Sequence, residues 1–229
     1  MKHVIHIPLS KVEVLQALQK ALQYDFIDNL RNRHINVQLD SKLRGYIGEL
    51  AFKKWMAEQG ILFEQSNVKD ESSGMDIDFI FKTEDSKSIE IELKTSLLPD
   101  IDETIENSFS KRDIKLIRRG HDSIEQLKGD VHVQFYFKQL RMRKDEWLKQ
   151  QEVDIEKENI ESLYAKLAAY RYMDDTYFMG WIDKKSLVKQ LINKSKYLQK
   201  WKYGQREFWC CSMKKDAKKP IELVHYLKK

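Results

Sequence analysis

Cysteine is scarce in this sequence. Of 229 residues only Cys210 and Cys211 are cysteines, and adjacent cysteines rarely form a disulfide with each other. Since no other cysteine could pair with them, the sequence indicates a reducing compartment, and we expect a cytoplasmic protein. The same scarcity excludes a zinc site built on cysteine pairs, and His121 and His132 have no partner at metal-ligand spacing.

Long apolar runs are also missing. Residues 1–8 lack the apolar stretch of a signal peptide, and no window approaches the length of a transmembrane helix. We therefore expect no membrane partner. A glycine-rich phosphate loop is absent as well, so we expect no nucleotide cofactor.

Charge is unevenly distributed along the chain, whose net charge is +5. Residues 184–229 hold 14 Lys and Arg against 3 Asp and Glu, a net charge of +11, whereas the rest of the chain holds 27 against 33, a net of −6. A basic segment beside an acidic centre suits a polyanion held near a metal site. A solvated lysine-rich tail is the alternative explanation.

The composition is that of a folded protein, with 41% hydrophobic and 11% aromatic residues. No repeat, Gly/Ser linker or shift in composition divides the chain. We expect a single domain over residues 1–229, with a core at about 41–182 and a basic C-terminal part at 184–229. The predicted fold class is α/β, with a central mixed β-sheet flanked by helices.

Helices are predicted where apolar residues recur at helical spacing. The first opens at Ser10 with the capping-box pattern Ser-Lys-Val-Glu and runs to near Leu30. The second spans about 41–59 and stops at Gly60, and residues 31–41 before it are expected to form a surface loop. Other helical segments are expected at 123–128, at 140–175 with a charged loop in the middle, and at 184–194.

Two glycines stand inside the second predicted helix. Gly45 and Gly48 each lower the stability of a helix by roughly 1 kcal/mol relative to alanine. We expect them where another backbone or a ligand approaches closely.

Strands are predicted where side chains alternate or where a short apolar run lies between turns. The expected strands are residues 3–8, 61–65, the two halves of 74–96, 131–137 and 176–182, with 207–212 and 221–227 as a closing pair.

The stretch from Gly74 to Ser96 is the most informative part of the sequence. Its halves, Gly-Met-Asp-Ile-Asp-Phe-Ile-Phe and Ser-Ile-Glu-Ile-Glu-Leu-Lys-Thr-Ser, both alternate between charged and apolar residues. The polar linker at 82–87 is short enough for an antiparallel hairpin. We expect its turn to be centred near Asp85.

This register brings acidic and basic side chains together. With the turn at that position, Asp78 lies opposite Glu92, and Asp76 lies opposite Lys94. Because strand side chains repeat every two residues, carboxylates and an amine then meet on one face. A cross-strand ladder of salt bridges without a metal is the alternative, worth about 0.2–1 kcal/mol per pair.

Together with the upstream helix string Gly-Glu-Leu-Ala-Phe at 48–52, this hairpin resembles the PD-(D/E)XK nuclease superfamily, whose fold is restriction-endonuclease-like. The resemblance covers residues 45–96 and, more loosely, the strands at 131–137 and 177–182. The proline of the family name is absent before either aspartate.

The resemblance implies roles for five side chains. Asp78 and Glu92 are expected to bind Mg²⁺, for which Mn²⁺ can substitute, with Lys94 as the catalytic amine. Glu49 is expected to complete the metal site. Asp76 is either a second ligand or the family aspartate, because the Gly-x-Asp spacing favours Asp76 whereas the hairpin register favours Asp78.

The resemblance also implies two further groups, one on the hairpin and one on or after the strand at 131–137. The Leu93 carbonyl is an expected extra metal ligand. Gln134 or Gln139 lies where some relatives place a polar active-site residue, with a solvated strand face as the alternative.

These features predict a Mg²⁺-dependent DNA endonuclease that hydrolyses phosphodiester bonds. A chain without an ATPase part most resembles a type II restriction endonuclease, which we expect to bind double-stranded DNA as a homodimer. The alternatives are a structure-specific repair, recombination or phage-encoded nuclease, and a non-cleaving DNA-binding module. Basic residues with interleaved aromatics are the predicted DNA contacts: Arg141, Arg143, Lys144, Lys200, Trp201, Lys202 and Arg206.

Overall fold

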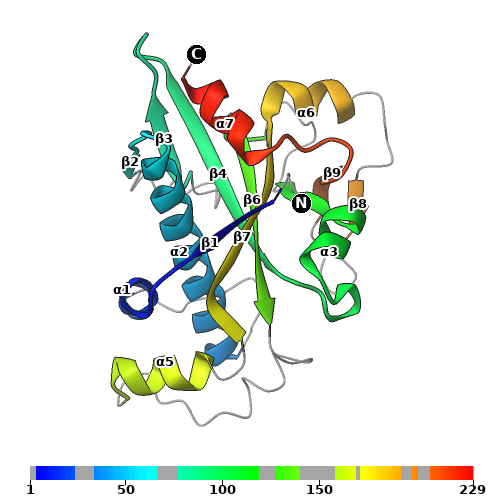
Figure 1. The fold of residues 1–229 in the computed structure, drawn as a ribbon. Coiled ribbons are helices and arrows are strands. Elements are labelled where there is room, and N and C mark those ends of the chain that lie inside the picture. The colour runs from blue at the N-terminus through cyan, green and yellow to red at the C-terminus, as the bar shows by residue number, and fades with distance from the viewer. Residues whose placement is uncertain are drawn as a thin grey trace.

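A computed structural model describes the chain over residues 4–23, 34–65, 77–118, 127–139, 158–168, 171–191, 198–200 and 207–228. Its elements form a large sheet with helices on both sides (Figure 1). The prediction of a mixed α/β protein is therefore confirmed. None of the helices described is both long and apolar enough to cross a membrane.

Six strands build the large sheet. They are β1 (Ile5–Pro8), β2 (Glu64–Gln65), β3 (Phe79–Lys82), β4 (Ser88–Leu97), β6 (Val131–Gln139) and β7 (Arg171–Asp183). Their spatial order is β1-β7-β6-β4-β3-β2. Strands β4 and β6 run parallel, and the other neighbouring pairs are antiparallel, so the sheet is mixed as predicted.

Helices α1 (Lys11–Leu22), α2 (Ile35–Glu58) and α5 (Ile160–Ala168) lie on one side of the sheet (Figure 1). The larger core lies between these helices and the sheet. At its centre, the ring of Phe52 contacts the rings of Phe79, Phe135 and Phe178, which come from three strands. Helix α7 (Pro220–Leu227) adds buried apolar side chains to the same core.

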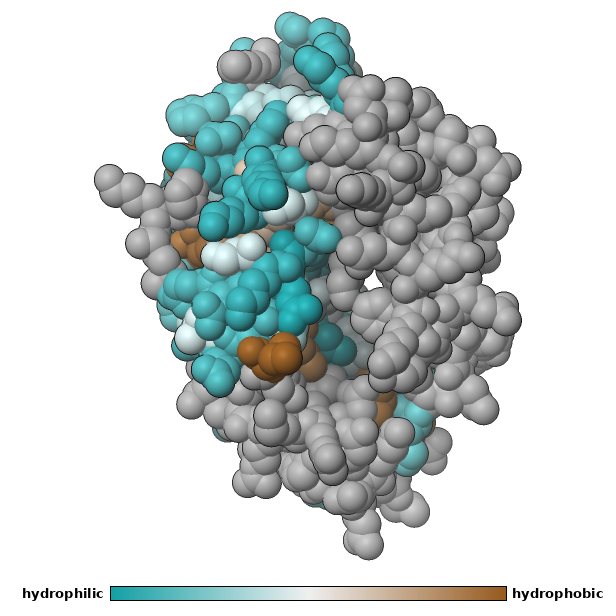
Figure 2. Space-filling model, turned by 90° about the vertical axis from the view of Figure 1, so that its right-hand side faces the viewer, coloured by the Kyte–Doolittle hydropathy of each residue, from teal (hydrophilic) through white to brown (hydrophobic). Residues whose placement is uncertain are grey.

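A smaller layer covers the other side. It contains the 3₁₀ turn η1 (Asp100–Asp102), α3 (Ile105–Lys111), α6 (Lys184–Leu191) and a three-stranded sheet of β5 (Asp113–Arg118), β9 (Glu207–Ser212) and β8 (Leu198–Lys200) in that order. A second core joins Met179 and Ile182 of β7 to Leu116 and Cys211 of the small sheet. Figure 2 shows a largely hydrophilic surface over the described atoms of this side, broken by small apolar spots.

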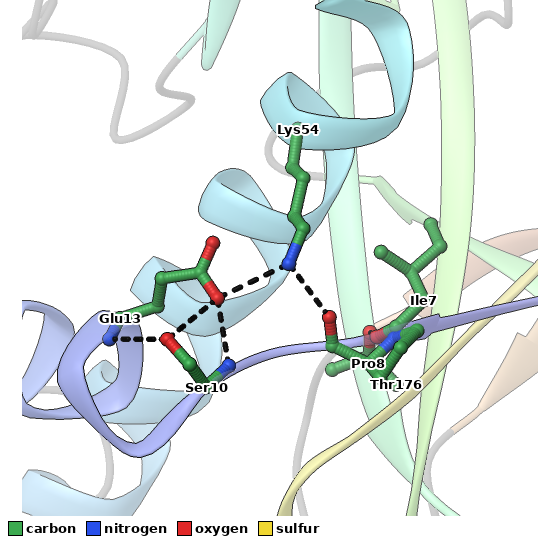
Figure 3. Close-up of polar contacts among 6 residues, drawn as sticks. All are labelled: Ile7, Pro8, Ser10, Glu13, Lys54 and Thr176. Atoms are coloured by element: carbon green, nitrogen blue, oxygen red, sulfur yellow. Dashed lines mark hydrogen bonds and ion pairs between the residues drawn. The ribbon is translucent and has the colours of Figure 1, made fainter. Parts of the chain in front are cut away.

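The N-terminal segment is fastened to both α2 and β7 (Figure 3). Ser10 and Glu13 form the predicted capping box at the start of α1. Nζ of Lys54, on α2, donates to Oε2 of Glu13 at 3.1 Å and to the carbonyl of Pro8 at 2.9 Å. On the other side, the buried hydroxyl of Thr176 donates to the carbonyl of Ile7 at 2.6 Å. The predicted edge strand is confirmed, paired with β7.

Helix α2 begins at Ile35, so the prediction of a surface loop is wrong for residues 35–41. Its N-cap is His34, whose side chain accepts the N–H of Asn36 at 3.3 Å. Asn36 and Asp40 are each 1% exposed, and these buried polar residues conceal the apolar period of the first turns. The predicted stop is confirmed at Gly60, whose φ is +74°.

Two predictions for the C-terminal half are wrong. Residues 221–227 form helix α7 and not a strand, because Pro220 occupies its first turn and its apolar residues recur at helical spacing. Residues 171–175 belong to β7 and not to a helix. The predicted strand at 207–212 is β9, which pairs with β5 and β8.

Some predicted helices lie partly outside the residues that the structure describes. The helical segment at 140–175 is described only from residue 158, where α5 confirms its later part. Residues 123–126 of the short predicted helix are also outside, and Leu127 and Lys128 are not helical. Strand β5 and helix α3 occupy a charged stretch for which the sequence predicted no element.

Candidate functional site

The hairpin of β3 and β4 has the predicted register. Phe79 pairs with Ile91, and Lys82 pairs with Ser88, so the turn is centred on Asp85. The N–H of Thr83 donates to the carbonyl of Lys87 at 2.9 Å and closes the turn. The paired positions end at Phe79, and one further step in the same register would set the residue before it opposite Glu92.

Asp78 is that residue, and it forms hydrogen bonds with Ile91 and Leu93, the two chain neighbours of Glu92. Its N–H donates to the carbonyl of Ile91 at 3.1 Å. Its Oδ2 accepts the N–H of Leu93 at 2.6 Å. Backbone pairing between the strands therefore ends at Asp78, whose carboxylate takes the place of a backbone acceptor.

The carboxylate of Glu92 is held from two directions and is only 3% exposed. Nζ of Lys94, two residues along the same face, donates to Oε1 of Glu92. Nδ1 of His132 lies 3.0 Å from Oε2 of Glu92. His132 reaches it because β4 and β6 are parallel and pair Glu92 directly with His132.

The two carboxyl groups differ in their affinity for a proton. Burial raises the pKa of Asp78 to about 7, against opposing effects of Lys94 and the Leu93 N–H. Burial also acts to raise the pKa of Glu92, but Lys94 and His132 outweigh it and lower this pKa to about 2. At neutral pH Glu92 is therefore ionised, whereas Asp78 is divided between its two forms.

Glu49 lies on α2, and its charge contributes to raising the pKa of Asp78. Nζ of Lys20 donates to Oε2 of Glu49 at 3.4 Å and lies 4.3 Å from the ring centre of Tyr46. Burial raises the pKa of Glu49, and nearby lysines oppose that shift. Glu49 is thus near the pair of carboxylates, but its carboxylate is engaged by a lysine of α1.

Close packing of α2 on β4 brings Glu49 toward this site. A β-carbon on Gly48 would lie 2.5 Å from Cγ2 of Thr95 and 3.1 Å from Cδ2 of Leu93. Gly48 does lie at a close approach, but side chains of β4 make it and not the backbone or ligand that we expected. At Gly45 a β-carbon would meet none of the described atoms within 4 Å, so no close approach to the described residues is seen there.

Gln134 lies beside Lys94 on β6 and is fully buried. Its Nε2 donates to the carbonyl of Lys94 at 3.1 Å and lies 3.2 Å from Oγ of Ser96. The solvated alternative is therefore wrong for Gln134. The side chain of Gln139 lies outside the description.

Sequence reasoning missed His132 as a neighbour of Glu92. The only available signal was the alternation of 131–137, which puts His132 and Gln134 on the same strand face. The parallel pairing of β4 with β6 joins residues 40 positions apart, and no local pattern specifies it.

Several predicted site residues fall outside the described ranges. Asp76 is one of them, so its choice against Asp78 as the family aspartate stays open. For Lys200 only the backbone is described, as part of β8. The other predicted DNA contacts lie entirely outside: Arg141, Arg143, Lys144, Trp201, Lys202 and Arg206.

The donor chemistry of Asp78 and Glu92 fits magnesium. Mg²⁺ prefers oxygen ligands, keeps several waters and is commonly held by only one or two carboxylates. Among the side chains that the structure describes, no three from His, Cys, Asp and Glu are grouped to hold a metal ion. A cation beside Asp78 would offset the burial that raises its pKa to about 7. The described residues therefore fit a cation held by two carboxylates.

Comparison with known proteins found no matching family model, no similar curated protein and no similar solved structure. The resemblance to the nuclease superfamily thus depends on the motifs of residues 45–96. The functional assignment depends on the contacts that those residues make.

Proposed function

We propose that the protein is a Mg²⁺-dependent endonuclease of the PD-(D/E)XK superfamily that hydrolyses phosphodiester bonds in DNA. The observation that carries the proposal is the geometry around Glu92. Asp78 forms hydrogen bonds with the backbone of both chain neighbours of Glu92. Lys94 donates to the carboxylate of Glu92 from the same strand face. The alternative, a ladder of surface salt bridges without a metal, does not require burial of Glu92, which is only 3% exposed.

The order and packing of the elements support a restriction-endonuclease-like core. Helix α2 packs against the hairpin through Gly48, and the hairpin continues the sheet into β6, which is parallel to β4. The antiparallel β7 follows at the other edge of β6. This helix, hairpin and two further strands correspond to the segments that carry the resemblance.

Hydrolysis of a phosphodiester needs an activated water and neutralised phosphate charge. Bound Mg²⁺ supplies both at carboxylate sites of this kind. Asp78 and Glu92 are the described residues that would hold it. The Leu93 carbonyl is a further candidate, because the N–H and C=O of one residue in an antiparallel ladder face the same neighbour, and the N–H of Leu93 faces Asp78.

Lys94 is the residue proposed to act on the reacting groups. Its side chain is 24% exposed, while that of Glu92 is 3% exposed, so its ammonium lies between the buried carboxylate and solvent. There it can orient the attacking water or stabilise the negative charge that develops on the phosphate.

We further propose double-stranded DNA as substrate and a type II restriction role with a homodimeric enzyme. The net charge of +11 in residues 184–229 supports a polyanionic partner. A two-fold enzyme suits cleavage of both strands at a symmetric site. We place the protein in the cytoplasm because its two cysteines are adjacent, and adjacent cysteines rarely bridge to each other.

Digestion of a supercoiled plasmid with and without Mg²⁺ tests this function. Discrete bands that need Mg²⁺ would support restriction. Smears, or cutting confined to branched DNA, would indicate a structure-specific nuclease of the same chemistry. Retained DNA binding without cleavage in Mg²⁺ or Mn²⁺ would contradict the enzyme proposal and indicate a binding module. A neighbouring methyltransferase gene would independently support the restriction role.

A further inference from the structure

A histidine lies behind the candidate metal ligand Glu92, and the mechanism above does not use it. His132 has none of its surface exposed. It pairs with Glu92 in the parallel ladder, and its Nδ1 lies 3.0 Å from Oε2 of Glu92. A buried histidine at this place has no access to substrate, so its effect must pass through the carboxylate it contacts.

The direction of the hydrogen bond follows from the chemistry of the pair. Ionised Glu92 can only accept a hydrogen bond, so Nδ1 of His132 carries the proton and donates. Within the described part of the chain Nε2 of His132 has no hydrogen-bond partner, so Glu92 is the one partner that the described residues give this ring.

Packing restricts the two side chains further. Gly129 adopts φ of +79°, and a β-carbon there would lie 3.5 Å from Cβ of Glu92 and 3.6 Å from Cε1 of His132. The same β-carbon would lie 3.7 Å from Cδ1 of Ile77. The chain that leads into β6 thus passes close to both Glu92 and His132, with space for no more than a small side chain at Gly129.

We infer that His132 is a positioning residue that holds Oε2 of Glu92 and thereby fixes the orientation in which this carboxylate accepts from Lys94 and would bind a cation. Partners behind a metal ligand fix its orientation and commonly change metal affinity by about 10–100-fold when removed. The inference rests on the proposed function, since it assigns His132 a role toward the cation that Glu92 would bind.

Three substitutions separate this role from simple filling of the core. His132→Asn can place an amide N–H near the position of Nδ1, whereas His132→Gln carries its amide further out and His132→Leu has no donor. Thr176→Val is the control, because it also removes a buried hydrogen bond but lies at the pair Phe137–Thr176 of the β6–β7 ladder, five residues along β6 from His132.

We expect His132→Leu and His132→Gln to raise the Mg²⁺ concentration for half-maximal cleavage by about 10–100-fold. His132→Asn should restore it to within a few-fold of the wild type, and KM for DNA should stay unchanged in all three. Thr176→Val should lower the melting temperature without moving the Mg²⁺ dependence. An unchanged Mg²⁺ dependence in folded His132→Gln, or a shift in Thr176→Val as large as in His132→Gln, would overturn the inference.

Two measurements test the role of His132 without relying on DNA cleavage. The thermal stabilisation that Mg²⁺ gives without DNA should require higher Mg²⁺ in His132→Gln than in His132→Asn. ¹⁵N NMR of the wild type should show a proton on Nδ1 of His132. An unprotonated Nδ1 would overturn the inference even in an active enzyme. A wild type that binds Mg²⁺ and carries the proton on Nδ1 but cuts no DNA would overturn only the proposed function.

Discussion

A β-carbon added to Gly48 would lie 2.5 Å from Cγ2 of Thr95, a distance at which two carbon atoms overlap. Thr95 is on β4, one residue beyond Lys94, and it is a β-branched residue with a stiff side chain. Gly48 therefore sets how closely α2 approaches the strand that carries the candidate catalytic residues. The neighbouring Glu49 depends on the same approach for its distance from Asp78.

Gly48→Ala should destabilise the protein by about 1–3 kcal/mol through overpacking, less the roughly 1 kcal/mol that alanine gains in a helix. Gly45→Ala is the matched control on the same helix, where a β-carbon meets none of the described atoms within 4 Å. It should stabilise by about 0.5–1 kcal/mol. Denaturant unfolding of both variants measures the difference.

The overlap also predicts a specific rescue. Thr95→Ser removes Cγ2, so the double variant Gly48→Ala/Thr95→Ser should recover part of the stability that Gly48→Ala alone loses. Strictly additive free energies of unfolding for the two substitutions would show that they do not touch, and would contradict the packing of α2 on β4.

The pKa of Asp78 predicts how stability without metal depends on pH. The folded-state pKa is about 7 and the ordinary value is 3.8. Between these values the folded protein keeps a proton that the unfolded chain has lost, so the contribution of Asp78 to stability falls as pH rises toward 7. Above pH 7 it stays at its minimum.

Asp78→Asn should remove this dependence, because asparagine has no proton to lose and can still accept the Leu93 N–H. In EDTA, the melting temperature of Asp78→Asn minus that of wild type should increase from pH 5 to pH 7.5 and then level off. With Mg²⁺ added, the stabilisation of the wild type should be larger at pH 8 than at pH 6. A melting-temperature difference that is constant with pH would show that Asp78 is not buried in its acid form.

Substitutions of Glu49 and Lys20 should change the affinity for Mg²⁺ in opposite directions. If Glu49 is a metal ligand, the ammonium of Lys20, 3.4 Å from its Oε2, competes with the cation. Glu49→Gln should then weaken Mg²⁺ binding by at least about tenfold, whereas Lys20→Met should strengthen it by a few-fold. Mg²⁺ titrations followed by thermal stabilisation compare the two. A weakening of similar size in both variants would indicate that the ion pair is structural.

The hairpin could be predicted from the sequence because its information is local. Alternation defines the two strands, the polar linker fixes the turn, and burial of Phe79 and Ile91 on one face excludes a slip by one residue. Those features alone predict that Asp78 lies beside Glu92, and its hydrogen bonds to Ile91 and Leu93 agree.

What could not be predicted depends on contacts between distant segments. The first turns of α2 bury Asn36 and Asp40, so this part of the helix lacks the apolar stripe from which its later turns were predicted. The contact of His132 with Glu92 requires the parallel pairing of β4 with β6. Parallel strands need a crossover connection, whose register no short motif encodes.

The central claim is that Lys94 acts on the phosphodiester beside the Asp78 and Glu92 carboxylates, and the rate of plasmid cleavage by Lys94→Met tests it most directly. Methionine keeps an unbranched stem but loses the ammonium. Lys87→Met is the matched control, since Lys87 lies in the turn of the same hairpin with its side chain 78% exposed.

With Mg²⁺ present, Lys94→Met should cleave at least about 100-fold more slowly than wild type, while binding the same DNA with an affinity within a few-fold in the absence of metal. Lys87→Met should cleave at the wild-type rate. Wild-type cleavage by folded Lys94→Met would contradict the account.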